Sequence, residues 1–260
     1  MLIDTLDLSI LGPALIAGLL VLATHVPLGM VVLKRGIIFI DLAIAQIAGL
    51  GVIYAHSLSD DPSIISIQII ATSSALFGAV FLRWTERNWP DIQEAIIGVA
   101  FVVSACAGLL LLANNPHGSE HLKDLLAGQI LWVNDSQLIS TLILYAIILG
   151  IWFGYKKSQS GLGFYLLFAI TITASVQLMG VYLVFSSLII PALAVHRLPA
   201  GNKKILLAYV CGICGYVAGL VISTLADLPS SPVIVLSLTA SAILFWWLIA
   251  VRSKQRNSPL

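Results

Sequence analysis

Apolar runs of about 20 residues recur along almost the whole chain, and this pattern constrains the fold more than any other feature. As a helix, a run of this length crosses the ~30 Å hydrocarbon core of a bilayer. Composition agrees, because 59% of the 260 residues are hydrophobic, only 10% are charged, and the mean hydropathy is +1.03. The sequence therefore predicts an all-α integral membrane protein, without spare length for a water-soluble catalytic domain.

Charged and turn-forming residues divide the apolar runs into eight or nine predicted membrane-spanning helices. We treat residues 1–260 as a single transmembrane domain. The predicted spans cover residues 10–33, 36–58, 63–82, 92–113, 138–155, 204–225 and 233–251, together with an apolar block at 161–195.

The block at 161–195 is too long for one span and too short for two spans with a loop. We expect a full span followed by a short returning helix near residues 180–196, interrupted around Gly180 and Pro191. Non-helical backbone at membrane depth is tolerated only where protein or a water-filled cavity covers it. We therefore expect protein or a water-filled cavity around this break.

Positive charge falls at alternate turns, which predicts the orientation of the chain. Cytoplasmic loops of membrane proteins carry an excess of Lys and Arg. We therefore expect the basic turns and the C-terminus in the cytoplasm, and the N-terminus outside if the returning helix reaches the inner face. Net charge is only +1, and we expect no nucleic-acid partner. The basic groups are Lys34/Arg35, Arg83/Arg87, Lys156/Lys157, Arg197/Lys203/Lys204 and Arg252/Lys254/Arg256.

Asp41 is the first candidate functional residue, because it lies about one and a half turns inside the predicted second span. Ionisable groups inside a membrane are costly, so they are usually paired and functional. His25 on the first span is predicted at a similar depth, and Pro27 beyond it would free a backbone carbonyl. A carboxylate with an imidazole suits zinc or manganese. The alternative is that Asp41 hydrogen-bonds a Ser or Tyr and only joins two helices.

Gln46 is a weaker candidate for the same site. On an ideal helix it lies about 140° around the axis from Asp41, so it points elsewhere unless the helix is distorted. Gly49 and Gly51 would permit such a distortion, or simply close helix packing.

The segment His117-Gly118-Ser119-Glu120-His121 fits the H-x-x-E-H spacing of some zinc peptidases. It follows Asn-Asn-Pro and contains a glycine, which favours a loop over a catalytic helix. The segment allows three interpretations. It is an external metal-capturing loop that uses His117, Glu120 and His121, an ordinary solvated loop, or the site of an intramembrane metalloenzyme. The sequence has no G-x-x-x-x-G-K-[ST] motif, so the chain does not bind ATP through a P-loop. If it takes part in ATP-driven transport, another subunit must hydrolyse the ATP.

Four segments together resemble a known family over most of the chain. Residues 32–49 resemble an arginine-turn-"GDALSHA..G" hairpin, and residues 94–101 resemble "DTAIGVVF". Residues 126–131 resemble "LFGDILAV", and residues 176–192 resemble "VVGVLLVSALLIIPAA". These patterns are similar to those of the membrane permeases of the zinc/manganese ABC importers.

The resemblance implies a type II importer-like permease in the bacterial cytoplasmic (inner) membrane. It implies two permease copies, an ATP-binding cassette subunit dimer, and an extracytoplasmic metal-binding protein. It also implies that the chain is a transport subunit and not an enzyme, with a divalent metal as cargo and no tightly bound cofactor. The segment from Pro191 to Lys204, with His196 and Arg197, would couple the permease to the ATPase.

One position departs from the family pattern. The family hairpin carries Asp and, four residues later, His, whereas here Ala45 follows Asp41 at that spacing and Gln46 stands beside it. Either His25 supplies the imidazole, or Asp41 acts with weaker ligands. Zinc is the expected cargo, with manganese or iron next. A metal chelate or another small solute, and an ATP-independent carrier, are the remaining alternatives.

Overall fold

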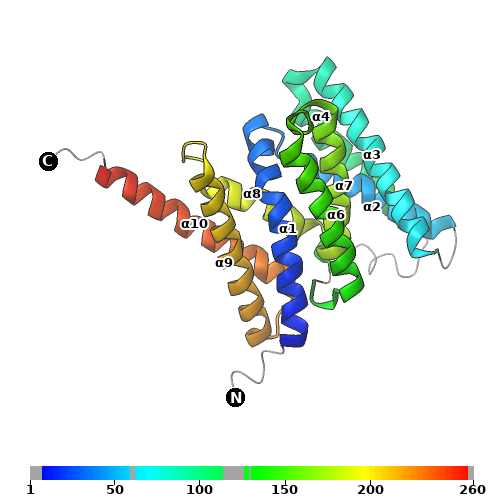
Figure 1. The fold of residues 1–260 in the computed structure, drawn as a ribbon. Coiled ribbons are helices and arrows are strands. Elements are labelled where there is room, and N and C mark those ends of the chain that lie inside the picture. The colour runs from blue at the N-terminus through cyan, green and yellow to red at the C-terminus, as the bar shows by residue number, and fades with distance from the viewer. Residues whose placement is uncertain (1–7, 59–61, 114–125, 129, 257–260) are drawn as a thin grey trace.

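The computed structural model describes residues 8–58, 62–113, 126–128 and 130–256, and these residues form a helical bundle (Figure 1). Eight helices are long and apolar enough to cross a membrane, and a shorter apolar helix, α8, lies among them. The span-length helices are α1 (Leu8–Arg35), α2 (Ile40–Leu58), α3 (Ile64–Asn88), α4 (Gln93–Leu112), α6 (Asp135–Gly154), α7 (Gly161–Met179), α9 (Asn202–Ala226) and α10 (Ser230–Arg256), with α8 at Val181–Ala194. The prediction of eight or nine helices with one short member is confirmed.

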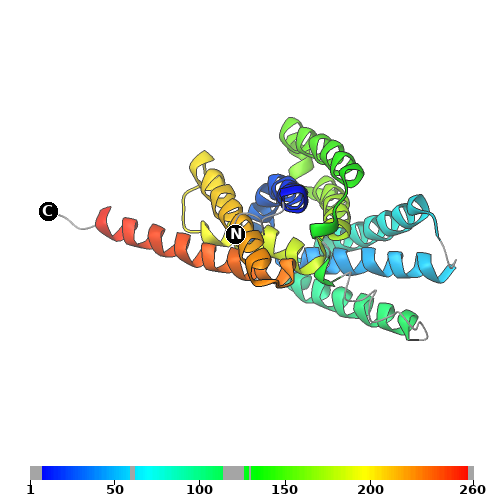
Figure 2. The ribbon, with the colours of Figure 1, turned by 90° about the horizontal axis from the view of Figure 1, so that it is seen from below.

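The helices form two flanking groups around a central one. Helices α2, α3 and α4 pack together on one side, and α9 packs along α10 on the other (Figures 1 and 2). Between them, α1 contacts α8, and α7 contacts both α2 and α3. The C-terminal end of α10 projects away from the rest of the bundle (Figure 2). The central helices therefore carry most of the interior.

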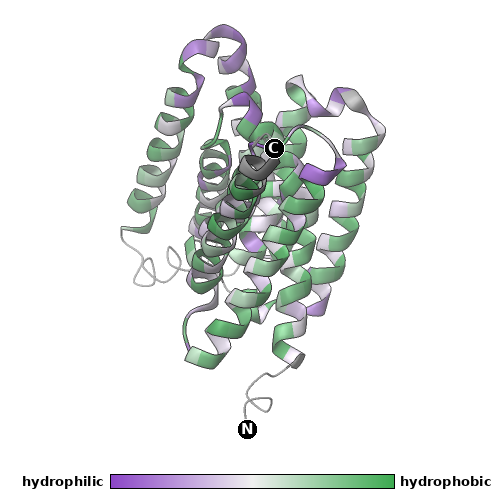
Figure 3. Cartoon of the chain, turned by 90° about the vertical axis from the view of Figure 1, so that its left-hand side faces the viewer, coloured by the Kyte–Doolittle hydropathy of each residue, from purple (hydrophilic) through white to green (hydrophobic). Residues whose placement is uncertain are grey.

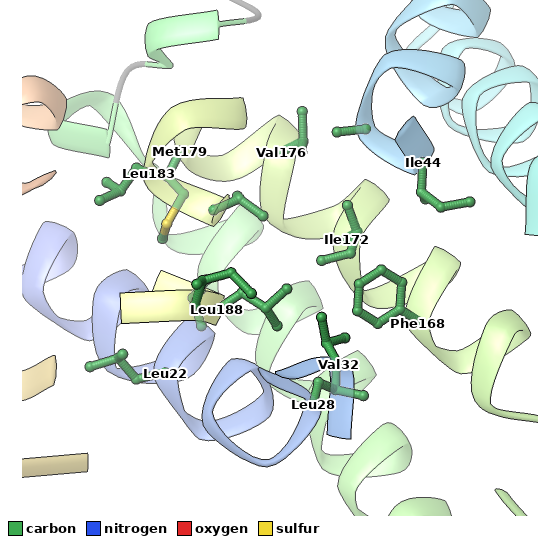
Figure 4. Close-up of a cluster of buried hydrophobic side chains, with 14 of the residues drawn as sticks. Leu22, Leu28, Val32, Ile44, Phe168, Ile172, Val176, Met179, Leu183 and Leu188 are labelled. Atoms are coloured by element: carbon green, nitrogen blue, oxygen red, sulfur yellow. The ribbon is translucent and has the colours of Figure 1, made fainter. Parts of the chain in front are cut away.

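The core lies where α1, α2, α7 and α8 converge (Figure 4). Large aliphatic and aromatic side chains fill this region, and each is almost completely buried. In lipid, such close packing rather than exclusion of water holds helices together. The side chains that meet here include Leu22, Leu28 and Val32 of α1, Ile44 of α2, Phe168 and Ile172 of α7, and Leu188 of α8.

Gly180 makes the predicted break between α7 and α8. It adopts a φ of 82°, a backbone conformation that favours glycine. A methyl group on Gly180 would overlap the backbone of Gly128, so the segment at 126–128 packs directly against the break. The predicted returning helix is thus confirmed, but Pro191 does not end it, because α8 continues to Ala194.

The turn between α1 and α2 corrects the predicted start of the second span. Gly36 has a φ of 71°, and the Ile37 amide donates to the Val32 carbonyl at 3.4 Å, so the chain reverses here instead of beginning a helix. Helix α2 starts at Ile40. Asp41 consequently lies in the first turn of α2 and not one and a half turns inside it.

Four segments meet at the polar end of the bundle: the end of α1, the end of α3, the turn at Lys156–Gln159 and the start of α7. The Arg35 guanidinium donates to the Gln159 carbonyl at 2.9 Å, lies 3.8 Å from the Glu86 carboxylate, and covers the Phe164 ring at 4.2 Å. Arg83 also pairs with Glu86. Figure 3 shows hydrophilic residues at turns on the end of the bundle opposite the N-terminus. Arg83 and Arg87, which we expected at a turn, lie inside α3, because this helix continues to Asn88, beyond the predicted span at 63–82.

Candidate functional site

Asp41 is buried in the protein interior, and no side chain of the described residues pairs with its carboxylate. Its side chain is 1% exposed. Neither carboxylate oxygen has a hydrogen-bond partner within the described part of the chain. The predicted alternative, in which Asp41 bonds a Ser or Tyr to join two helices, is therefore not what the structure shows. Its position in the first turn of α2 places it near the positive end of the helix dipole, which stabilises a carboxylate only in part.

Glu94 approaches the same helix end from α4. Its Oε1 accepts a hydrogen bond from the Phe39 amide at 3.1 Å, directly before α2 begins. Its Oε2 is buried and has no hydrogen-bond partner among the described residues. In the sequence, Glu94 stands out only as the first residue of the segment 94–101 that resembles a family pattern. The signal that could have drawn attention to it is an acidic residue in the first turn of an otherwise apolar helix.

His25 is buried in α1, and one of its ring nitrogens has no hydrogen-bond partner among the described residues. Thr24 donates its hydroxyl proton to the Val21 carbonyl at 3.1 Å, so its oxygen is assigned as the acceptor for Nδ1–H of His25, also at 3.1 Å. The neutral ring then presents the lone pair of Nε2, which has no partner among the described residues. A free imidazole lone pair is what a metal ligand requires. No hydrogen bond links His25 to Asp41 in the described ranges.

Gln46 faces a cavity of about 830 Å³ between α2, α4, α8 and α10. Leu42, the neighbour of Asp41, lies on the same wall. Phe39 stacks on Phe185 of α8, with 6.4 Å between the ring centroids, and so links the start of α2 to the cavity wall. The cavity is mainly apolar, and its polar side chains are Gln46, Ser104, Tyr182 and Ser186.

The predicted coupling residues divide into one buried residue and two exposed ones. Pro191 is buried inside α8, whereas His196 and Arg197 are exposed in the turn that follows. His196 donates from Nδ1 to the Leu193 carbonyl at 2.8 Å, and the Arg197 guanidinium covers the Trp246 ring at 4.8 Å. The turn is therefore held against both α8 and α10, with its basic group at the surface.

The remaining candidates, His117, Glu120 and His121, lie outside the described residues. Within the described ranges, no group of three or more His, Cys, Asp or Glu side chains is arranged to hold a metal ion. The described residues thus offer the carboxylates of Asp41 and Glu94, the Nε2 of His25, and the Gln46 amide at the edge of a cavity.

Comparisons with known proteins agree with this fold. A "Probable metal transport system membrane protein" of Chlamydia muridarum is 27% identical over 184 residues, covering 63% of this chain and 63% of the relative's length. The "High-affinity zinc uptake system membrane protein ZnuB" of Haemophilus influenzae is 24% identical over 259 residues, covering 91% and 95%. Among solved structures, PsaBC from Streptococcus pneumoniae in complex with Fab matches with a TM-score of 0.74 and 22% identity, covering 95% of both chains. Residues 7–160 and 154–249 match the family described as the ABC 3 transport family, and the chain belongs to this family.

Proposed function

We propose that this chain is the membrane permease subunit of an ATP-driven importer of divalent metal ions, and that it is a transport subunit and not an enzyme. The observation that carries the proposal is Asp41, a buried carboxylate whose two oxygens have no hydrogen-bond partner among the described residues. An ionised group in this setting costs several kcal/mol, which a cation in transit would offset. The names of the Chlamydia and Haemophilus relatives, metal transport and zinc uptake, support the same cargo class.

Asp41 is the principal ligand in this proposal, with His25 and Gln46 as the other contacts along the path. The free Nε2 of His25 supports its role, because imidazole with carboxylate favours zinc. Manganese and iron are the next candidates, since oxygen donors also suit them. The metal is transported cargo, and the proposal includes no tightly bound cofactor.

A second copy of the permease completes the path. Zinc takes about four ligands and manganese about six, more than one chain brings together in its described residues. Two copies facing each other double the number of available donors. The proposed unit is therefore a homodimer in which residues 1–260 form one transmembrane domain of each copy.

The basic end of the bundle faces the cytoplasm in this proposal, as does the C-terminus. Arg35 and Arg83 lie together at this end, and excess Lys and Arg marks the cytoplasmic side. The exposed turn of His196 and Arg197 would then dock an ATP-binding cassette subunit dimer. An extracytoplasmic metal-binding protein would deliver the cargo at the opposite face of the bacterial cytoplasmic membrane.

A second candidate cargo is a metal chelate or another small solute. The observation that favours it is the 830 Å³ cavity beside Gln46, because sites for small organic molecules measure roughly 300–1,000 Å³. A chelate would require the cavity itself as its binding site. Competition between free metal and chelated metal in an uptake assay separates the two cargoes.

The test is reconstitution of the permease with its ATPase subunits in liposomes, followed by uptake across a panel of Zn²⁺, Mn²⁺ and Fe²⁺. We expect uptake that requires both ATP and the ATPase subunits. Uptake by the permease alone would instead identify an ATP-independent carrier. Failure to move any free divalent metal while a chelate is transported would overturn the metal-ion assignment.

A further inference from the structure

Helices α3 and α4 leave a groove between them on the surface of the bundle. Each of the two packs along α2, but they make few contacts with each other. Figure 2 shows α3 and α4 on opposite sides of α2. The groove has a volume of about 780 Å³, and Ile47 and Leu50 of α2 form its floor.

The groove follows from the order of small and large side chains on the two helices. Ser74 and Gly78 lie one turn apart on α3, and Ala100 and Ser104 have the same spacing on α4. These small side chains leave space between the helices. The larger Phe77 also lines the groove but is 76% exposed, so it borders the space without filling it.

The lining suits a hydrocarbon chain better than water or a charged solute. No charged side chain lines the groove, and its polar side chains are three serines. An empty groove would forfeit dispersion contacts on one side of its walls. Its volume lies in the range of roughly 300–1,000 Å³ that holds small organic ligands. In a bilayer, the apolar matter at hand to fill it is a lipid acyl chain.

An aromatic cluster continues the groove toward the polar end of α3. Phe81 lines the groove, and its ring centroid lies 6.2 Å from that of Trp84. The Trp84 ring in turn meets the Trp89 ring edge to face at 5.1 Å. Both tryptophans are about half exposed. Because Trp is enriched at the level of lipid headgroups, these rings mark that level beside the groove.

Arg87 supplies a positive charge at the same level. It is exposed in the last turn of α3, three residues after Trp84 and therefore on a neighbouring part of the helix surface. The ion pairs at this end join Arg35 and Arg83 to Glu86, and none among the described residues involves Arg87. Basic side chains at a membrane surface attract anionic headgroups. The Arg87 guanidinium is therefore available to a lipid phosphate.

We propose that the groove between α3 and α4 binds an anionic phospholipid, with an acyl chain along Phe77 and Phe81 and the phosphate at Arg87. A second copy of the chain is the alternative occupant of an apolar groove. The aromatic cluster and the unpaired cation at one end favour the lipid, because an apolar chain with a charged head matches both parts. The inference does not depend on which cargo the permease transports.

The test uses two substitutions with matched controls. Arg87→Gln removes the charge, and Lys157→Gln removes an exposed charge from the turn between α6 and α7. Ser73→Leu adds bulk from an exposed position that lines the groove. Ser140→Leu makes the same change at an exposed position of α6.

The measurement is a titration of the full-length permease in detergent with phosphatidylglycerol and with phosphatidylcholine of identical acyl chains, followed by native mass spectrometry. We expect the wild type to bind phosphatidylglycerol more tightly than phosphatidylcholine. Arg87→Gln should weaken phosphatidylglycerol binding about fivefold and remove this preference. Ser73→Leu should weaken the binding of both lipids at least about fourfold, the effect of excluding one methylene group. Both controls should bind as the wild type does.

Equal binding of the two lipids by the wild type, or an unchanged preference in Arg87→Gln, would overturn the proposal. Ser73→Leu that binds lipid normally but shifts the permease from dimer to monomer would also overturn it and identify the groove as a face between two copies. Should Ser73→Leu fail to fold, Arg87→Gln decides the question, because its side chain is exposed.

Discussion

The Tyr209 hydroxyl of α9 donates a hydrogen bond to the Ala23 carbonyl of α1 at 2.9 Å. This is the carbonyl that the amide of residue 27 would bond in a regular helix, and residue 27 is proline. A side chain 186 positions away thus satisfies the backbone group that Pro27 leaves free, two residues from His25. The bond fixes α9 against the part of α1 that presents the free imidazole.

Tyr209→Phe should lower the free energy of unfolding by about 1 kcal/mol, the usual net value of one hydrogen bond. The measurement is a thermal melt of the purified protein in detergent. Pro27→Ala restores an amide donor for the Ala23 carbonyl, so Tyr209→Phe should cost much less in that background. Equal costs in both backgrounds would contradict the proposed compensation between Tyr209 and Pro27.

Gly180→Ala should prevent normal folding of the α7–α8 break. The φ of 82° is strained for alanine, at about 1–3 kcal/mol. The added methyl group would also overlap the Gly128 backbone. We expect loss of the monodisperse peak in size-exclusion chromatography. Gly98→Ala is the control, because a methyl group there meets nothing within 4 Å, and it should elute as the wild type does.

Asp41→Ala should abolish metal uptake while leaving assembly with the ATPase intact, because it removes the buried carboxylate without adding bulk. His25→Ala should reduce Zn²⁺ uptake more than Mn²⁺ uptake, since imidazole favours zinc. Uptake by reconstituted complexes and copurification of the ATPase are the two measurements. Normal metal uptake by an assembled Asp41→Ala complex would exclude Asp41 from the transport path. If the His25→Ala variant takes up Zn²⁺ and Mn²⁺ each at the wild-type rate, His25 is excluded from the path.

Arg197→Ala should weaken copurification of the ATPase, because Arg197 is the basic group exposed in the proposed docking turn. Trp246→Leu removes the ring that Arg197 covers and should weaken the binding of the ATPase to the permease by only about two- to fivefold, since a cation–π contact contributes ~0.5–1 kcal/mol. Trp247→Leu changes an exposed neighbouring ring outside that contact and serves as the control. An Arg197→Ala variant that retains the ATPase fully would place the docking surface elsewhere.

Much of the architecture follows from the order of residues along the chain. Hydropathy located the spans, because each helix must satisfy its own backbone and cover the bilayer thickness. The break at Gly180 was visible as an apolar block of the wrong length for one or two spans. Asp41 and His25 were visible because ionisable groups are rare in such segments.

Other features depend on how the helices pack. The chain turns at Gly36, so α2 begins only at Ile40. Asp41 therefore lies in the first turn of α2 and not deeper in the helix. The meeting of Glu94 with the start of α2, and of Tyr209 with Ala23, joins segments far apart in the sequence.

The sequence by itself determined which segments are apolar and long enough to cross the membrane, because hydropathy and helical backbone hydrogen bonding are local properties. It also identified the ionisable residues inside those segments. Only the tertiary structure decided which polar groups face one another. The physical reason is that lipid is as apolar as a leucine side chain, so the apolar pattern of a span does not specify which neighbour it packs against. Close packing between particular helices makes that choice, and it places the Glu94 carboxylate against the Phe39 amide at the start of α2.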